Sequence, residues 1–417
     1  MAAEAGILTL CQHDRSFSNN QSSYTVDLGT GDAMTDCQWD KRVDLKRILL
    51  GSADGYAYLY NLDKSSSPLA CFDSGGEAVK VGRWCDHVIA IGGRDGAIRL
   101  FDTRTASRSS RLNEPVLMIA GAHRIKPQGP GLISSLSFLN ENHLLSIGQP
   151  NYNVLVWDKR FTKTSKPVDY FENPTSHGKR TRAFIDICHL PDASAFVAVN
   201  SNHHIYKVNA ANMCVERDYW HPEMFLNSFY LRAQSSPDGL YLACGSSGKG
   251  AVWIFNSDCR NNIDQSNDKV CVLEQDASDI IEGQFDCTGV AWHPTGDMLA
   301  CSLDSGLVTQ WGEHTRRRDG TVFQARLIDT PKSDEYCNTG SSCFSHSSQH
   351  YSNTGNLTPW PLDPPCVYNK PGKNETSMFD MINLDHTKTP MRTPKRSILD
   401  YFSSSERASP VKKRIVM

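Results

Sequence analysis

One short pattern, an aromatic residue followed by Asp, any residue and Arg, occurs twice in the sequence, and its residues are suited to binding a partner. It reads FDTR at 101–104 and WDKR at 157–160. An arginine carries a rigid fork of donors and a flat stacking face, which suit it to anchoring a protein interface. The aspartates are suited to orienting the local turn or the arginine rather than to catalysis. The candidate interface residues are Phe101, Asp102, Arg104, Trp157, Asp158 and Arg160, and the alternative is that both arginines are solvated rim residues.

Patterns typical of catalysis or metal binding are weak. The fourteen cysteines form no CxxC pair and no metal-like spacing with histidine. The histidines His189, His203, His204 and His293 fall in predicted strands or turns without a paired nucleophile or carboxylate. We therefore expect no catalytic residue, no metal and no cofactor, and a protein that is not an enzyme.

Composition limits the class of partner. The chain has 417 residues and a net charge of −3, so nothing draws it as a whole toward nucleic acid or an acidic membrane. It has no pattern typical of a signal peptide and no apolar run of the ~18 residues that a membrane span needs. Several cysteines, such as Cys188, Cys244 and Cys301, lie in apolar runs, which indicates a reducing compartment. We expect no sequence-specific nucleic-acid binding and no membrane contact.

Six repeat segments must position the interface residues. Each reads as an apolar strand, a second strand ending in small residues, a tight turn with Asp or Asn, and a strand that closes on an aromatic residue. Their spacing is close to the ~40–45 residues of a WD-repeat blade with loop insertions. The closing aromatics are Tyr60, Phe101, Trp157, Tyr206, Phe255 and Trp311. Small residues such as Gly92 and Gly93 are expected to allow close approach near the central channel.

The repeat predicts an all-β WD-repeat β-propeller over residues 34–315. Six blades are clearly legible, and we expect seven, because WD-repeat propellers commonly have seven with the last sheet closed by a strand from the other chain end. The alternative is a ring of six. Residues 1–33 contain GILTLC and SYTVDL, which are candidates for closing strands. Residues 316–417 are rich in Ser, Thr, Pro and charge, and we expect them to form a disordered regulatory tail.

Four stretches together resemble the denticleless (DTL) family of WD-repeat substrate receptors. They are GGRDGAIRLFDTR, IAGAH at 119–123, LLSIGQPNYNVLVWDKR and SFYLRAQSSPDGLYLACGSS. The resemblance covers roughly residues 34–312, although one propeller module at the N-terminal side is not recognisable and the tail is short for the family.

The resemblance implies a non-catalytic substrate receptor of a cullin-4 RING E3 ubiquitin ligase. Such a receptor docks on the damaged-DNA-binding adaptor through its Asp-x-Arg motifs, here those ending in Arg104 and Arg160. It directs ubiquitination of cell-cycle and replication proteins that are associated with PCNA and chromatin, so a nuclear location is expected. The alternative is a non-ligase WD-repeat scaffold that binds chromatin or histones, in which Arg104 and Arg160 have no docking role.

Near the end of the chain, KRSILDYF at 395–402 has the layout of a peptide that binds the sliding clamp PCNA. Ile398, Tyr401 and Phe402 occupy the apolar positions, and Lys395 replaces the usual glutamine. Among the Ser/Thr-Pro sites of the tail, we take as phosphorylation candidates those with a basic residue nearby, which are Thr389, Thr393 and Ser409. The basic clusters at 394–396 and 412–414 favour nuclear import, with ordinary solvated charge as the alternative.

Overall fold

The chain folds into β-strands joined by turns and loops. The computed structural model describes residues 7–11, 23–27, 32–40, 47–61, 68–105, 113–125, 131–160, 166–176, 181–257, 269–274, 285–296, 298–306, 308–312 and 324–329. Within these ranges there are twenty-six strands, β1 to β26. No helix in the described part of the chain is long and apolar enough to cross a bilayer.

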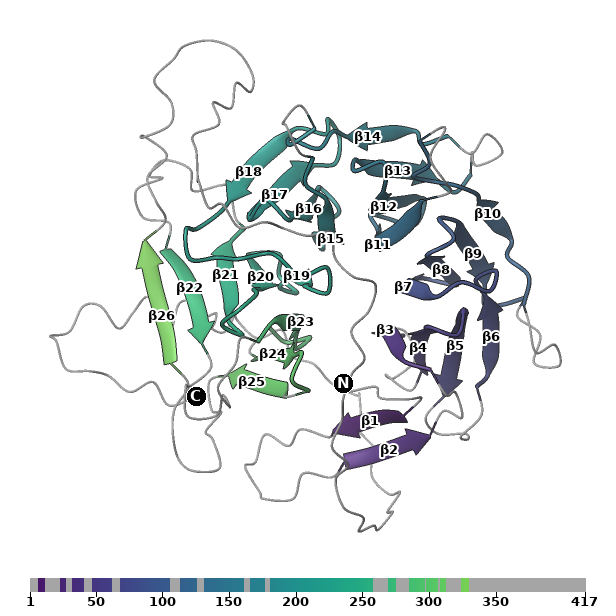
Figure 1. Ribbon diagram of the computed structural model, residues 1–417, viewed down its shortest axis with the longest axis horizontal. Coiled ribbons are helices and arrows are strands. Elements are labelled where there is room, and N and C mark those ends of the chain that lie inside the picture. Colours follow the sequence, from purple (N-terminus) through teal and green to yellow (C-terminus); the bar gives the residue numbers. More distant parts are fainter. Residues whose placement is uncertain are drawn as a thin grey trace, which may run out of the picture. The chain divides into compact units, whose positions relative to one another are not determined.

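Six antiparallel sheets form the blades of a propeller ring (Figure 1). From the innermost strand outward, the first blade consists of β3 (Met34–Trp39), β4 (Arg47–Ser52), β5 (Tyr56–Asn61) and β6 (Ala70–Asp73). The second blade consists of β7 (Val79–Cys85), β8 (Val88–Gly93), β9 (Ile98–Asp102) and β10 (Leu117–Ile119). The third blade consists of β11 (Leu132–Phe138), β12 (His143–Gln149), β13 (Val154–Asp158) and β14 (Asp169–Phe171). The fourth blade consists of β15 (Phe184–His189), β16 (Ala195–Asn200), β17 (His204–Asn209) and β18 (Val215–Tyr219). The fifth blade consists of β19 (Ala233–Ser235), β20 (Tyr241–Gly245), β21 (Val252–Asn256), β22 (Lys269–Glu274) and β26 (Gln324–Asp329). The sixth blade consists of β23 (Cys287–Trp292), β24 (Met298–Leu303) and β25 (Val308–Gly312).

The predicted all-β propeller is confirmed, and the described residues form six blades rather than the expected seven. The N-terminal strands β1 (Ile7–Cys11) and β2 (Ser23–Asp27) pair with each other in a two-stranded sheet and with no blade strand among those described. The strand β26 lies within the segment that the sequence assigned to the tail. It pairs with β22 of the fifth blade, while the sixth blade has three described strands. Sheet closure by the N-terminal strands is therefore not found in the described pairing.

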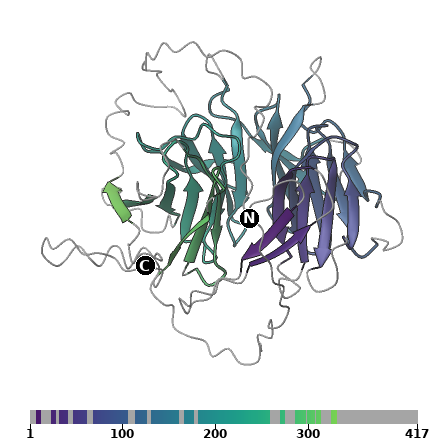
Figure 2. The ribbon, with the colours of Figure 1, turned by 60° about the horizontal axis from the view of Figure 1, so that its bottom comes forward.

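Burial explains why the middle strands of a blade are mostly apolar while an outer strand alternates. The strands β13 (VLVWD) and β16 (AFVAVN) are buried at almost every position, because neighbouring blades cover both of their faces (Figure 2). The outer strand β18 (VERDY) alternates between exposed and more buried positions. All six closing aromatics predicted from the repeat are buried in the third strands of their blades. Gly92 lies where an added Cβ would be 2.6 Å from Ile133 of the next blade, which confirms the predicted close approach.

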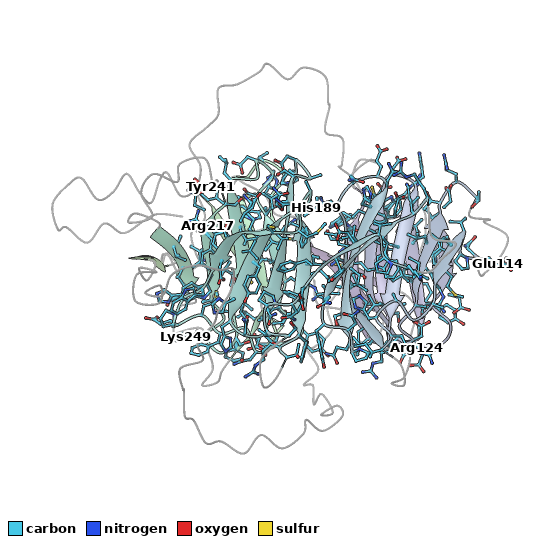
Figure 3. The ribbon with its side chains drawn as sticks, turned by 90° about the horizontal axis from the view of Figure 1, so that it is seen from above. Glu114, Arg124, His189, Arg217, Tyr241 and Lys249 are labelled. Atoms are coloured by element: carbon cyan, nitrogen blue, oxygen red, sulfur yellow. The ribbon has the colours of Figure 1, made fainter. Side chains whose placement is uncertain are left out.

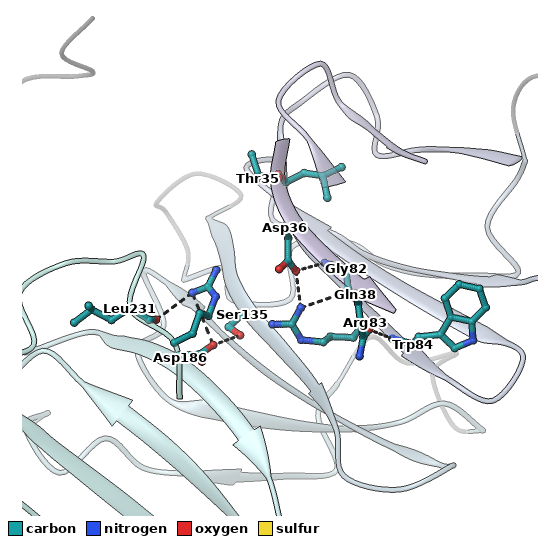
Figure 4. Close-up of polar contacts among 11 residues, drawn as sticks. Thr35, Asp36, Gln38, Gly82, Arg83, Trp84, Ser135, Asp186 and Leu231 are labelled. Carbon is teal, nitrogen blue, oxygen red and sulfur yellow. Dashed lines mark hydrogen bonds and ion pairs between the residues drawn. The ribbon is translucent and has the colours of Figure 1, made fainter. Parts of the chain in front are cut away.

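Side chains of the innermost strands hold successive blades in register. Each innermost strand lies beside that of the next blade from β3 to β23, without a shared backbone ladder. Asp36 instead accepts a hydrogen bond from the backbone N–H of Gly82 at 2.9 Å (Figure 4). Asp186 accepts one from the backbone N–H of Ala233 at 3.0 Å. Asp186 also accepts a bond from the Ser135 hydroxyl at 2.7 Å. Backbone donors of one blade are thus satisfied by carboxylates of the blade before it.

A buried hydrogen-bond chain joins the second and third blades. His123 precedes the third blade, and its Nδ1 lies 2.8 Å from the carbonyl oxygen of Asn151, so this nitrogen carries the proton and donates it. Its Nε2 lies 2.8 Å from the Ser146 hydroxyl. The indole N–H of Trp157 donates to the same hydroxyl oxygen at 2.8 Å. The Ser146 hydroxyl therefore donates to a neutral imidazole and accepts from the indole.

Candidate protein-interaction site

The two Asp-x-Arg motifs adopt the same conformation in neighbouring blades. In the second blade, Arg104 donates from Nε to Asp102 Oδ1 at 3.0 Å and from its Nη2 atom to Oδ2 at 2.6 Å. In the third blade, Arg160 makes the same two bonds to Asp158 at 2.9 and 2.7 Å. Each aspartate also accepts the backbone N–H of its own arginine at 2.9 Å. The repetition of this bidentate fork shows that the motif is a defined local structure rather than a chance pair of charges.

The blade fixes the base of each fork. Phe101 and Trp157 are the buried closing aromatics, so each aspartate comes directly after a side chain that cannot move. The residue between aspartate and arginine donates its backbone N–H to the neighbouring hairpin, from Thr103 to His87 at 2.8 Å and from Lys159 to Asn142 at 3.0 Å. The turn is therefore hydrogen-bonded before any partner arrives, which lowers the entropy cost of binding.

Each fork keeps its charge pair while presenting one face to solvent. The hydrogen bonds from Arg104 and Arg160 lower the pKa of Asp102 and Asp158 from 3.8 to about 2. The aspartate side chains are mostly covered, whereas those of Arg104 and Arg160 are 65% and 54% exposed. The aspartate uses one edge of each guanidinium, and the rest of the group remains available to a partner.

Both forks lie on the same face of the ring. Asp102 and Asp158 end the third strands of adjacent blades, and they pair with the first residues of the second strands, Val88 and His143. Tyr241 has the corresponding place in the fifth blade, and Figure 3 shows it on one face of the ring with Lys249 and Arg124 on the other. The fork face is therefore the one that carries Tyr241.

The fourth blade shows what the same strand position does without the motif. Lys207 stands where the second and third blades have aspartate, directly after the closing aromatic Tyr206. Its ammonium is buried and donates to the carbonyl oxygen of Ser257 in the fifth blade at 2.8 Å. Here the position joins two blades instead of orienting an exposed arginine.

Exposed apolar side chains flank the forks, and sequence reasoning missed them. Val116 and Met118 are about half exposed on and beside β10, and Val168 and Tyr170 are equally exposed on and beside β14. These strands form the outer edges of the two blades that carry the forks. A signal was present, because the dipeptide Pro-Val occurs at 115–116 and 167–168, just before the outer strands of those two blades.

An open hollow lies beside the fork of the third blade. It has a volume of about 430 Å³ and lies between the third and fourth blades, where Leu139, Val156, Val168 and Met213 supply apolar lining. His143 also lines it, and its Nε2 is 3.7 Å from Asp158 Oδ2. The fork face thus combines an exposed arginine with a depression of mixed polar and apolar lining next to it, a combination that suits a protein partner.

The predicted tail residues lie outside the described part of the chain. These are Lys395, Ile398, Tyr401 and Phe402 of the clamp-binding pattern and Thr389, Thr393 and Ser409 of the phosphorylation candidates. Within the described ranges, no group of three His, Cys, Asp or Glu side chains is placed to hold a metal ion. The histidines considered above make hydrogen bonds within the ring, for example His189 with Ser137 of the preceding blade and His293 with Thr295 of its own turn.

The fold and the forks define the class of protein, a WD-repeat β-propeller. No protein-family model matches the chain. Over 233 residues it is 27% identical to the cell division cycle protein cdt2 of Schizosaccharomyces pombe, covering 52% of this chain and 44% of that protein. It is 27% identical over 193 residues to the Denticleless protein homolog A of Xenopus laevis, covering 40% and 27% of the two chains. It is 24% identical over 243 residues to the Drosophila melanogaster protein lethal(2)denticleless, covering 52% and 30%.

These matches agree with the resemblance of the sequence to the denticleless family noted above. The aligned region spans less than half the length of each of these three relatives.

Proposed function

We propose that this protein is the substrate receptor of a cullin-4 RING E3 ubiquitin ligase. Arg104 and Arg160 dock on the damaged-DNA-binding adaptor, and the receptor directs ubiquitination of PCNA-associated and chromatin-associated cell-cycle and replication proteins. In this role the propeller performs no chemistry itself, and ubiquitin transfer belongs to partner subunits. The observation that carries the proposal is the pair of matched forks on one face of neighbouring blades.

The docking role is supported by the fact that the arginines of the forks are not needed for blade folding. Four of the six repeats close without an Asp-x-Arg motif, so blade folding does not require the arginines. Both guanidinium groups are held by a depressed-pKa carboxylate, stand more than half exposed, and adjoin exposed apolar side chains. Rigid arginines next to apolar surface are typical anchors of protein interfaces.

The test is co-purification of the adaptor with the full chain and with the double variant Arg104→Ala/Arg160→Ala. We expect the variant to stay folded and its affinity for the adaptor to fall by at least about tenfold, because each arginine is an anchor whose contacts alanine cannot replace. Arg124→Ala is the matched control, since Arg124 is an exposed arginine on the opposite face (Figure 3). Undiminished adaptor binding by the double variant contradicts the docking role and favours the non-ligase scaffold.

A second contact is proposed for the tail. The pattern of Lys395, Ile398, Tyr401 and Phe402 supports binding to PCNA, because one helical turn would bring the three apolar side chains onto one face. Each buried side chain would contribute roughly 1.5–3 kcal/mol, against about 2–5 kcal/mol for ordering the segment. The tail should therefore bind modestly and act mainly by raising the local concentration of the receptor at the clamp. This role requires a nuclear protein, which the basic clusters of the tail support.

A further inference from the structure

The hollow beside the fork of the third blade is lined in part by two hairpin turns of the fourth blade. The first turn, residues 190–194, joins β15 to β16, and the second, residues 210–214, joins β17 to β18. The backbone N–H of Ala210 in the second turn donates to the carbonyl oxygen of Ser194 in the first at 2.9 Å. The two turns are therefore bonded to each other and hold their part of the lining in place.

One lining residue in each of these turns has a backbone conformation that is unusual for its type. Ala193 has a φ of 57° and Met213 a φ of 55°, in the left-handed region where a side chain crowds its own backbone. In the described part of the chain, four residues other than glycine have a positive φ, and these are two of them. Both border the same hollow, so the strain is concentrated at one site.

The equivalent turns of the next two blades have glycine at the position of Ala193. The segments read PDASA at 191–195, PDGLY at 237–241 and PTGDM at 294–298. In each, the third residue donates its backbone N–H to the carbonyl oxygen three residues earlier, at 3.0 Å from Ala193, 2.9 Å from Gly239 and 2.8 Å from Gly296. Gly239 and Gly296 have φ values of 74° and 76°, which glycine adopts without strain. The turn therefore does not need the strained methyl group of Ala193.

The polar groups of the lining are bonded close to where they stand in the sequence. Asn140 Oδ1 accepts the backbone N–H of His143 at 2.9 Å. The Ser194 hydroxyl donates to Asp192 at 2.9 Å. Asp169 is exposed at the edge of the hollow, and its charge disfavours an anionic occupant. The apolar side chains are therefore the main surface that the hollow offers for recognition.

We propose that the hollow receives one large apolar side chain of the same partner that docks on the forks. This inference rests on the proposed function, because it adds a contact to that docking surface. The hollow is continuous with the fork, since His143 lines it and has its Nε2 atom 3.7 Å from Oδ2 of Asp158, the carboxylate that holds Arg160. A filled pocket beside an arginine contact is a typical arrangement at the centre of a protein interface.

This role accounts for the strained turns. Ala193 and Met213 supply contact surface that glycine would not supply, and strained backbone is kept where a function uses it. The side chain of Val168, which lines the hollow and is 53% exposed, is covered by the same occupant. A volume of about 430 Å³ lies in the range of sites that enclose an organic group.

The experiment measures the affinity of the full chain for the purified adaptor by calorimetry. Ala211 is exposed at the edge of the hollow, so Ala211→Trp should fill it and weaken binding by at least about tenfold. Met213→Gly removes apolar lining and should weaken binding to a similar extent, with unchanged circular dichroism. Ala193→Gly should weaken binding about fourfold, the effect of one buried methyl group, without lowering the urea midpoint of unfolding.

Ala53→Trp is the matched control, because Ala53 is also exposed but follows the end of β4, on the face opposite the forks. Its affinity for the adaptor should equal that of the wild type. The inference is overturned if Ala211→Trp and Met213→Gly bind as tightly as the wild type. It is also overturned if Ala193→Gly unfolds at lower urea, because the methyl group would then serve packing of the turn.

The double variant Arg104→Ala/Arg160→Ala keeps the two proposals apart. Weak binding by this variant together with wild-type binding by the hollow variants rejects the hollow and leaves the docking role in place. A wild-type chain without affinity for the adaptor rejects both.

Discussion

Lowering the pH from 7 to 5 should destabilise the propeller, and His123 should account for a defined share of that loss. Its side chain is completely buried between the second and third blades. Burial lowers the pKa of His123 from 6.5 to about 4, even though its hydrogen bonds to Asn151 and Ser146 oppose the shift. In the native protein the Nε2 atom must accept the Ser146 hydroxyl, and protonation would place a donor there instead.

The sign and size of this change in the free energy of unfolding follow from proton linkage. Between pH 6.5 and pH 4 the unfolded chain binds a proton at His123 that the folded chain does not bind. The free energy of unfolding therefore falls as the pH falls through this window. A shift of two and a half pKa units corresponds to about 3 kcal/mol when fully expressed, of which about 2 kcal/mol is lost by pH 5.

The assay is urea unfolding followed by circular dichroism at pH 7 and pH 5, for the wild type and for His123→Gln. Glutamine cannot titrate, so the variant should be less stable at pH 7 but should lose about 2 kcal/mol less than the wild type between the two pH values. His87→Gln is the control, because the His87 side chain is 43% exposed. It should keep the wild-type pH dependence.

Parallel pH profiles for the wild type and His123→Gln would refute the reasoning. They would mean that His123 carries the same proton in the folded and unfolded chains. A profile in which only His87→Gln departs from the wild type would assign the pH dependence to an exposed histidine instead.

Two further predictions concern the inner ring and the tail. Asp186→Ala leaves the buried donors of Ser135 and Ala233 without their acceptor, so the free energy of unfolding in urea should fall by about 3–5 kcal/mol. The control Asp169→Ala, at an exposed position, should change this free energy by less than about 0.5 kcal/mol. Equal effects of the two substitutions would contradict the bridging role of Asp186. A peptide of residues 387–408 should bind PCNA in calorimetry, and should lose binding with Tyr401→Ala/Phe402→Ala. Phosphate on Thr393 should weaken it, because we expect Lys395 and Arg396 to face acidic surface; tighter binding of the phosphopeptide would show that the sign is wrong.

The repeat itself could be predicted because each of its signals is local. A closing aromatic such as Trp157 follows an apolar strand and a tight turn within one short segment. Gly96, in the predicted turn at 94–96, has a φ of 72°, the left-handed conformation that glycine adopts without strain. The Asp-x-Arg forks were also local, since aspartate and arginine are two residues apart. The position of each blade strand and the geometry of each fork therefore depend on residues that are close together in the sequence.

Features that depend on distant segments could not be predicted in this way. The pairing of β26 with β22 crosses the whole sixth blade, and its partner cannot be chosen from the apolar pattern of Gln324–Asp329. The repeat segment that begins at Ser228 was interpreted as an apolar strand. The described strand begins at Ala233, and Phe229 and Tyr230 are exposed in a loop. The consecutive apolar residues Phe229, Tyr230 and Leu231 look like a strand in the sequence, whereas the structure buries Leu231 and leaves Phe229 and Tyr230 exposed.

The forks lie at the ends of the third strands β9 and β13, on one face of the ring, and this position has a mechanical consequence. A strand of five to seven residues spans roughly 20 Å at about 3.3 Å per residue. A partner on the forks is therefore separated from the opposite face of the ring by the depth of a sheet. Between them lie inner strands bridged by Asp36 and Asp186, which resist relative movement of the blades. A second partner on the opposite face would not compete with one on the forks, because each could bind and leave while the other stays in place.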